Sequence, residues 1–133
     1  MKRLWILLLF ISSLMADTIH FETNYEAAMK KAQAENKVLM AVIVQTYCPW
    51  CDKFKKRTLV DPEVVKVVGE NFVALMLNKD VDDMPQDIRA RMVPTTFFLD
   101  HKGEEVYSTI GYKHPRNFLE DVREAIALSK EQQ

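Results

Sequence analysis

Runs of apolar residues predict the strands of this chain. Residues 38–44 are seven apolar residues in a row, which is typical of a central strand covered on both faces. Three further strands are predicted at residues 72–77, 95–99 and 105–110. The last two are joined by a short turn with hairpin chemistry, in which Gly103 suits a positive φ.

Helices are predicted around these strands, at residues 24–36, 49–58, 62–70, 85–91 and from 115 onward. Thr23 and Glu26 form a possible capping box for the first helix. Asp61 and Pro62 read as the N-cap and first residue of the third. The last helix is amphipathic, with one apolar side made of Phe118, Leu119, Val122 and Ile126.

The order of these elements predicts the fold class. The connection between the first two strands contains helices, so it should be a right-handed crossover between parallel strands. The hairpin makes the last two strands antiparallel. We therefore expect an α/β fold with a mixed central sheet and helices on both faces.

The N-terminal segment has the layout of a secretory signal peptide. Lys2 and Arg3 precede an apolar run from Leu4 to Met15, which Ala16 follows. That run is shorter than the roughly 20 residues of a membrane span, although an uncleaved anchor remains the alternative. We expect residues 1–16 to be the signal peptide and residues 17–133 to be one domain in the periplasm.

Composition and charge reduce the number of function classes that fit this chain. Without the first 16 residues the chain has 16 basic and 19 acidic residues, a net charge of −3, which gives no reason to expect nucleic acid as a partner. A chain with 48% hydrophobic residues can build a core without disulfide staples. The two cysteines close a loop too short to restrain an unfolded chain, so their placement indicates chemistry.

The segment Cys48-Pro49-Trp50-Cys51 follows the central strand and opens a helix. Residues three apart on a helix are neighbours, so the two thiols can form a reducible disulfide. At the helix start, free N–H groups and the helix dipole stabilise the thiolate of Cys48, the attacking species in exchange. Pro49 suits the first helical position. We expect Cys48 to be the nucleophile and Cys51, one turn further, the less exposed resolving thiol.

Other readings of the same residues are weaker. Half of a zinc ribbon has the same cysteine spacing, but this chain has no other cysteine and its three histidines are scattered. A two-cysteine metal site and an inert buried pair stay as alternatives, and no metal or cofactor is predicted. An acidic loop lacks the glycine and glutamate of an EF-hand, which favours a solvated surface over a calcium site; it contains Asp80, Asp82, Asp83 and Asp87.

Residues 24–128 resemble the thioredoxin superfamily. The resemblance rests on the buried strand before Tyr47-Cys48-Pro49-Trp50-Cys51, on Val93-Pro94-Thr95 before a hairpin, and on Gly111 after it. Residues 37–65 are most similar to small exported bacterial thioredoxins, including ones linked to sulfur-compound oxidation and cytochrome c maturation.

The resemblance implies a thioredoxin-like fold in which Pro94 is cis and faces the cysteine pair. Val93 and Pro94 would then form part of a groove that binds an extended peptide of the substrate. From the sequence alone, Pro94 is only a turn proline. Tyr47 precedes the first cysteine, and Pro49 and Trp50 lie between the two. All three are predicted to contact substrate, although Trp50 could instead pack against its own helix.

The chain also departs from the family pattern. Tyr47 stands where Trp is common, and Pro49-Trp50 replaces Gly-Pro. Cytosolic thioredoxins carry a buried Asp, a proton acceptor, six residues before the first Cys; here that residue is Val42. The sequence therefore identifies no general base for Cys51.

Charges on the helix bear on the direction of electron flow. Asp52 lies on the same helix face as Cys48 and disfavours its thiolate. Four cations at 53–57 act in the opposite direction, and Lys56 is expected to pair with Asp52; a solvated charged face is the alternative. The segment between Cys51 and Pro94 has no room for the inserted helical domain of the strongly oxidising relatives.

We therefore expect a monomeric, exported thiol–disulfide oxidoreductase that reduces disulfides in periplasmic proteins. A reductant outside the cytoplasm needs its own supply of electrons, which implies a membrane thiol–disulfide electron donor as a second partner. The alternative is a non-catalytic binding module that holds a protein segment or Cu(I) at the cysteine pair.

Overall fold

The predicted central strand is β2, Val38–Val44, and all seven of its residues are buried. The computed structural model describes residues 17–133, so the predicted signal peptide lies outside the described residues. Alternate residues of β2 point into two separate core clusters. Val38, Met40, Val42 and Val44 belong to one, and Leu39, Ala41 and Ile43 belong to the other. This strand is apolar throughout because both of its faces are covered.

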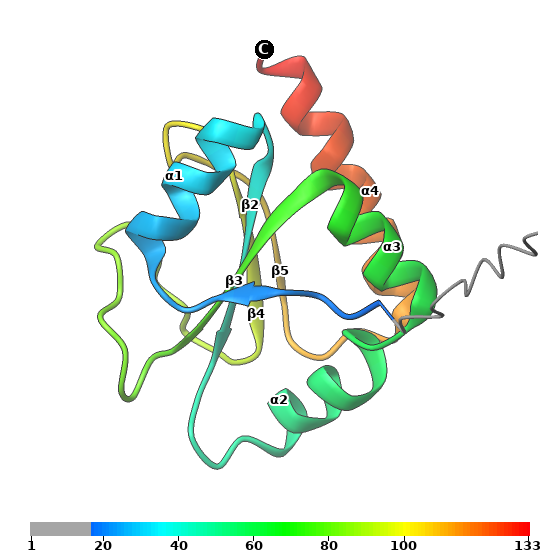
Figure 1. Cartoon of the computed structure of the whole chain (residues 1–133). Coiled ribbons are helices and arrows are strands. Elements are labelled where there is room, and N and C mark those ends of the chain that lie inside the picture. The colour runs from blue at the N-terminus through cyan, green and yellow to red at the C-terminus, as the bar shows by residue number, and fades with distance from the viewer. Residues whose placement is uncertain (1–16) are drawn as a thin grey trace, which may run out of the picture.

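The other strands are β1 (Phe21–Glu22), β3 (Phe72–Asn78), β4 (Thr95–Leu99) and β5 (Glu105–Ile110). They form one five-stranded sheet in the order β1-β3-β2-β4-β5 (Figure 1). β2 is parallel to β3 and antiparallel to β4, which confirms the predicted mixed sheet. The edge strand β1 was not predicted, because its two residues are too few to show a hydrophobic period.

The helical elements are α1 (Tyr25–Glu35), α2 (Pro49–Lys53), a π-helical turn η1 (Phe54–Thr58), α3 (Pro62–Asn71) and α4 (Pro115–Glu131). In Figure 1, α1 covers one side of the sheet, and α3 and α4 lie together on the other. The core clusters agree: one contains buried residues of α1, and the other contains those of α3 and α4. Helices therefore cover both faces, as the sequence predicts. None of the helices within residues 17–133 is long and apolar enough to cross a membrane.

Two details of the helix predictions are wrong. The N-cap of α1 is Asn24, whose side chain accepts a hydrogen bond from the Ala27 N–H at 2.9 Å, so the Thr23 capping box does not form. Residues 85–91 form a single turn, closed by the Ile88 N–H and the Pro85 carbonyl at 3.1 Å, followed by irregular chain. Ile88 is the one buried residue of this segment, so a helix there would have no apolar face to bury.

Gly103 is at the turn between β4 and β5 with a φ of +83°, which confirms the prediction of a positive φ. A Cβ atom at this position would lie 2.9 Å from the hydroxyl oxygen of Tyr25. Glycine therefore serves both the turn geometry and the close approach of α1.

Candidate active site

Cys48 and Cys51 form a disulfide at the junction between β2 and α2, with their Cα atoms 5.2 Å apart. Cys48 is the N-cap of α2, and its sulfur accepts a hydrogen bond from the Cys51 N–H at 3.1 Å. Pro49 occupies the first helical position. β2 ends at Val44, and a short turn leads from it to Cys48. The local sequence then starts the helix, since a cap residue followed by proline suits the N-cap and the first helical position.

The two cysteines differ in exposure. Cys51 is 1% exposed and belongs to the core cluster, whereas Cys48 is only partly buried. An attacking or leaving sulfur from another protein therefore reaches Cys48 more readily than Cys51. Two aromatic residues beside the disulfide face solvent: Tyr47 is 99% exposed, with a φ of +55°, and Trp50 is 56% exposed.

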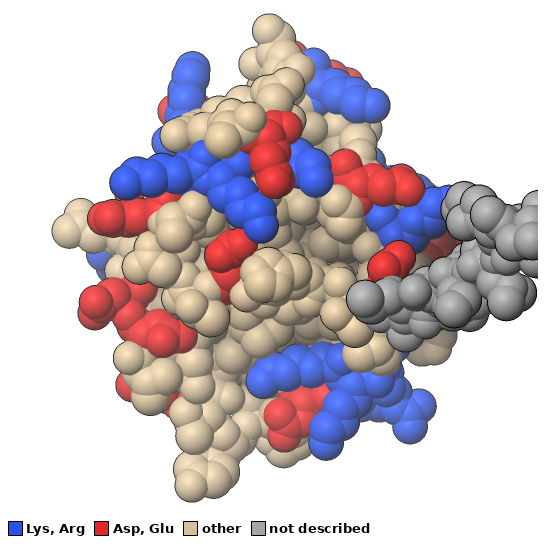
Figure 2. Space-filling model, viewed as in Figure 1, with Lys and Arg blue, Asp and Glu red and all other residues tan. Residues whose placement is uncertain are grey.

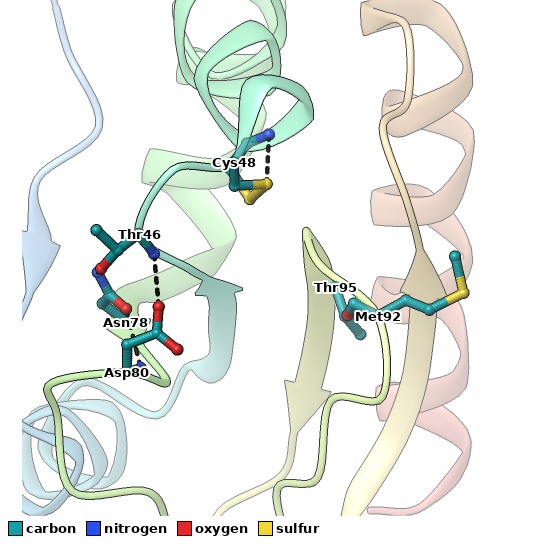
Figure 3. Close-up of a disulfide and its surroundings, with 7 residues drawn as sticks. Thr46, Cys48, Asn78, Asp80, Met92 and Thr95 are labelled. Carbon is teal, nitrogen blue, oxygen red and sulfur yellow. Dashed lines mark hydrogen bonds between the residues drawn. A yellow bond between two sulfur atoms is a disulfide. The ribbon is translucent and has the colours of Figure 1, made fainter.

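The loop before β4 lies at the same edge of the sheet as the disulfide. The pairing of β2 with β4 sets Ile43 beside Thr95, so the end of one strand meets the start of the other. Figure 3 shows the loop with Met92 and Thr95 across from the disulfide. The Val93–Pro94 peptide bond is cis, as the family resemblance implies. Pro94 is buried, and its carbonyl accepts a hydrogen bond from the Gly111 N–H at 2.7 Å.

A polar cluster holds the segment before Cys48 against the end of β3. The Thr46 N–H donates to Asp80 Oδ2 at 3.0 Å, and Asn78 Nδ2 donates to Thr46 Oγ1 at 3.1 Å (Figure 3). The Asp80 N–H in turn donates to Asn78 Oδ1 at 3.0 Å. The sequence predicts that Asp80 is a solvated residue of the acidic loop. Its role as a backbone acceptor was not predicted, because it depends on the alignment of β2 with β3.

Tyr112 contacts the residue between the two cysteines. Its ring centroid lies 5.8 Å from that of Trp50, and the ammonium of Lys53 lies 5.0 Å from the Trp50 ring and 4.8 Å from the Tyr112 ring. Thr58 Oγ1 also donates to the Lys113 carbonyl at 2.5 Å. The loop after β5 thus contacts α2 through Trp50 and η1 through Thr58. Along the sequence, Tyr112 is marked as a neighbour of the site only by its place directly after Gly111.

Val42 lies in the same core cluster as Cys51 and is 0% exposed. Its neighbours on the adjoining strands are Met76 and Thr96, neither of which ionises. The structure therefore supplies no carboxylate at this position of β2, in agreement with the sequence.

The predicted ion pair between Asp52 and Lys56 does not form within the part of the chain that the structure describes. Both side chains are exposed, so an ion pair between them would gain little energy against water and side-chain entropy. Across residues 17–133, no group of three or more His, Cys, Asp or Glu side chains is arranged to hold a metal ion.

The arrangement is that of a thiol–disulfide redox protein: an N-capping cysteine, a buried second cysteine and a cis-proline loop on one mixed sheet. Residues 25–126 match the family described as the thioredoxin-like domain. The chain belongs to this family.

Two curated relatives are similar to part of the chain. An uncharacterized protein of Borreliella burgdorferi is 31% identical over 94 residues, which are 71% of this chain and 41% of that protein. Anterior gradient protein 1 of Xenopus laevis is 31% identical over 84 residues, 63% of this chain and 46% of that protein. The chain thus spans less than half the length of either relative.

Solved structures share the fold. A thioredoxin from Thermus thermophilus has a TM-score of 0.72 at 24% identity, covering 84% of this chain and 91% of its own. The periplasmic thioredoxin SoxS from Paracoccus pantotrophus has a TM-score of 0.58 at 13% identity, covering 70% and 99%. At these identities the likeness establishes the thioredoxin-like fold and no finer property.

Proposed function

We propose that this protein is an exported thiol–disulfide oxidoreductase that reduces disulfides in periplasmic proteins. The observation that carries the proposal is the unequal pair: a partly exposed Cys48 at a helix N-cap, bonded to a Cys51 that is 1% exposed. Such a pair can exchange with an outside disulfide through one sulfur and close through the other.

In the first step, the thiolate of reduced Cys48 attacks one sulfur of the client disulfide. A bond forms between Cys48 and that sulfur, the client bond breaks, and the second client sulfur leaves as a thiolate that takes up a proton. In the second step, Cys51 loses its proton and attacks Cys48 Sγ, which releases the first client sulfur as a thiolate. Two electrons have then passed from the dithiol to the client, and the Cys48–Cys51 disulfide remains.

The fold supports the first step through the position of Cys48. The Cys51 N–H, which bonds Cys48 Sγ at 3.1 Å, would donate a charge-assisted hydrogen bond to the thiolate. The dipole at the start of the helix acts in the same direction. The second step lacks a carboxylate at Val42, so we propose that water accepts the proton of Cys51.

The proposed substrate groove lies between the disulfide and the cis-proline loop. Tyr47 and Trp50 are exposed beside the sulfurs, and Pro49 is exposed at the helix start. Across from them, Val93 and Pro94 would offer backbone groups to an extended client segment. All five residues remain proposed contacts.

The proposed cellular setting follows from the N-terminal sequence. Residues 1–16 would be a signal peptide, and residues 17–133 would act in the periplasm as a monomer. Likeness to a protein named a periplasmic thioredoxin supports this setting. Each turnover leaves the protein oxidised, so a membrane thiol–disulfide donor would supply two electrons and two protons to restore the dithiol.

Trapping of a mixed disulfide tests the assignment of the two cysteines. Reduced Cys51→Ser protein is expected to accumulate a covalent complex with a disulfide-containing client, because Cys48 attacks and nothing resolves the complex. The matched Cys48→Ser variant should form none. Trapping by Cys48→Ser alone would reverse the two roles, and a wild-type protein without exchange activity would favour the binding module.

The direction of electron flow needs the reduction potential of the wild-type protein. Alkylation in graded dithiol buffers would measure it. A value near the roughly −270 mV of thioredoxin supports a reductant, and a value near roughly −120 mV makes the protein an oxidant.

A further inference from the structure

A group of cations lies directly after the cysteine pair. Lys53, Lys55, Lys56 and Arg57 fall within five residues on α2 and η1, and we call them the cationic rim. No member of the rim forms an ion pair with a carboxylate of residues 17–133. Figure 2 shows basic side chains gathered over the position of α2 in Figure 1, with acidic surface among them.

The positive charge of the rim differs from the charge balance of the whole chain. The whole chain has a formal net charge of −1, so the patch is not a consequence of a basic composition. Lys53, Lys56 and Arg57 are exposed and Lys55 is half-buried. Unpaired cations on one helix repel each other, which favours their contact with an outside anion.

Apolar surface continues from the rim to the disulfide. The Lys53 ammonium lies over the rings of Trp50 and Tyr112, so the cations begin where the aromatic surface ends. Tyr47, the residue before Cys48, is also almost completely exposed. A segment bound here would meet apolar contacts at the sulfur and positive charge one to two turns away.

We propose that the cationic rim docks an acidic segment of the disulfide-containing client and so delivers the client's disulfide to Cys48. The inference rests on the proposed function and adds the client's chemical class to it. Complementary charge acts over about 10 Å at 0.1 M salt and mainly raises the association rate. The rim therefore affects which clients are attacked. The ratio of rates for acidic and basic clients within one variant isolates this effect, because any change in the reactivity of Cys48 applies to both clients alike.

Three synthetic peptides with the same internal disulfide test the proposal, flanked by three Glu, three Lys or three Gln residues. Purified reduced protein is mixed with each peptide, the reaction is stopped with acid, and the rate constant for loss of the peptide disulfide is measured. At low salt the Glu peptide is expected to react about tenfold faster than the Lys peptide, within the range of electrostatic steering. The ratio should approach one at high salt.

Charge reversal in the rim supplies the decisive comparison. The double variant Lys56→Glu with Arg57→Glu is expected to invert the ratio, so that the Lys peptide becomes the faster substrate. Lys30→Glu with Lys130→Glu makes the same change in net charge at exposed positions of α1 and α4. This control should keep the wild-type ratio.

The outcomes separate the two proposals. Equal rates for the three peptides, or an inverted ratio in the control variant as well, would overturn the docking role and leave the oxidoreductase intact. A protein that reduces none of the peptides would overturn the proposed function, and the docking role with it.

Discussion

Replacing Val42 by Asp would place a carboxyl group at the position where the related cytosolic thioredoxins carry one. Val42 is 0% exposed, at the centre of the sheet, and shares a core cluster with Cys51. Its cross-strand neighbours, Met76 and Thr96, offer no positive charge. The substitution therefore tests whether this site can hold an ionisable group at all.

The expected cost has two parts. Loss of a buried Val side chain costs about 1.5–3 kcal/mol, and burial of a polar group without a partner costs about 1–3 kcal/mol. The sum of about 2.5–6 kcal/mol is a large part of the roughly 5–15 kcal/mol that stabilises a typical domain. Burial also raises the pKa of the new carboxyl above its ordinary value of about 3.9.

The raised pKa gives the effect a definite dependence on pH. Stability should be greatest below the pKa of the unfolded chain and fall by about 1.4 kcal/mol per pH unit as pH rises toward the folded pKa. Urea unfolding of the oxidised protein, followed by circular dichroism at pH 4.5, 6.0 and 7.5, measures this slope. Val42→Asn has nearly the same shape, cannot ionise, and serves as the control.

Equal pH slopes for the Asp and Asn variants would refute the reasoning, because they would mean that the new carboxyl is solvated or paired. A second measurement concerns the chemistry. If the carboxyl accepts the proton of Cys51, the mixed disulfide should resolve faster in Val42→Asp than in Val42→Asn near neutral pH.

Other parts of the fold yield three further predictions. Phe118 is fully buried and meets Phe54 edge-on with ring centroids 5.1 Å apart, so Phe118→Ala should lower the free energy of unfolding by about 3–5 kcal/mol in urea titrations; a loss below about 1 kcal/mol would contradict the packing. Tyr47 has a φ of +55°, so Tyr47→Gly should relieve about 1 kcal/mol of backbone strain and raise the urea midpoint while slowing client reduction, and a lower midpoint would argue against strain. The Tyr107 hydroxyl donates to Asp121 Oδ1 at 2.9 Å, and this bond, with burial, raises the pKa of Tyr107. The bond therefore stabilises the fold below about pH 10, and this stabilisation is lost as pH rises through the raised pKa. In urea titrations, Tyr107→Phe should have a free energy of unfolding about 1.5 kcal/mol below that of the wild type at pH 8, and the difference should shrink by pH 11. A difference that stays constant would show that the hydroxyl is not its cause.

Several elements could be predicted because their signals are local. The strand at 38–44 has the predicted bounds, since an unbroken apolar run next to a charged helix leaves few alternatives. The start of α3 was also predicted, because Asp61 caps the Glu63 and Val64 N–H groups and Pro62 follows it. The predicted helix at 85–91 does not form, because proline and polar residues favour a helix start only where the helix has an apolar face to bury.

By itself, the sequence determined the redox pair and its surroundings along the chain. An apolar strand, a cysteine at the cap position, a proline and a second cysteine one helical turn later bring Cys48 and Cys51 together through spacing alone, and the two form a disulfide. The sequence also determined that position 42 has no carboxylate, because a valine stands there whatever the fold.

Only the tertiary structure decided what faces that pair. The pairing of β4 with β2 brings the loop with the cis Pro94 to the end of the sheet that carries the disulfide. Asp80 binds the Thr46 N–H from 34 positions away, and the ring of Tyr112 packs beside that of Trp50 from the loop after β5. Such contacts depend on strand order and register, which are set by the packing of the whole core. A hydrophobic period records which face of an element is buried, but not which residue lies opposite.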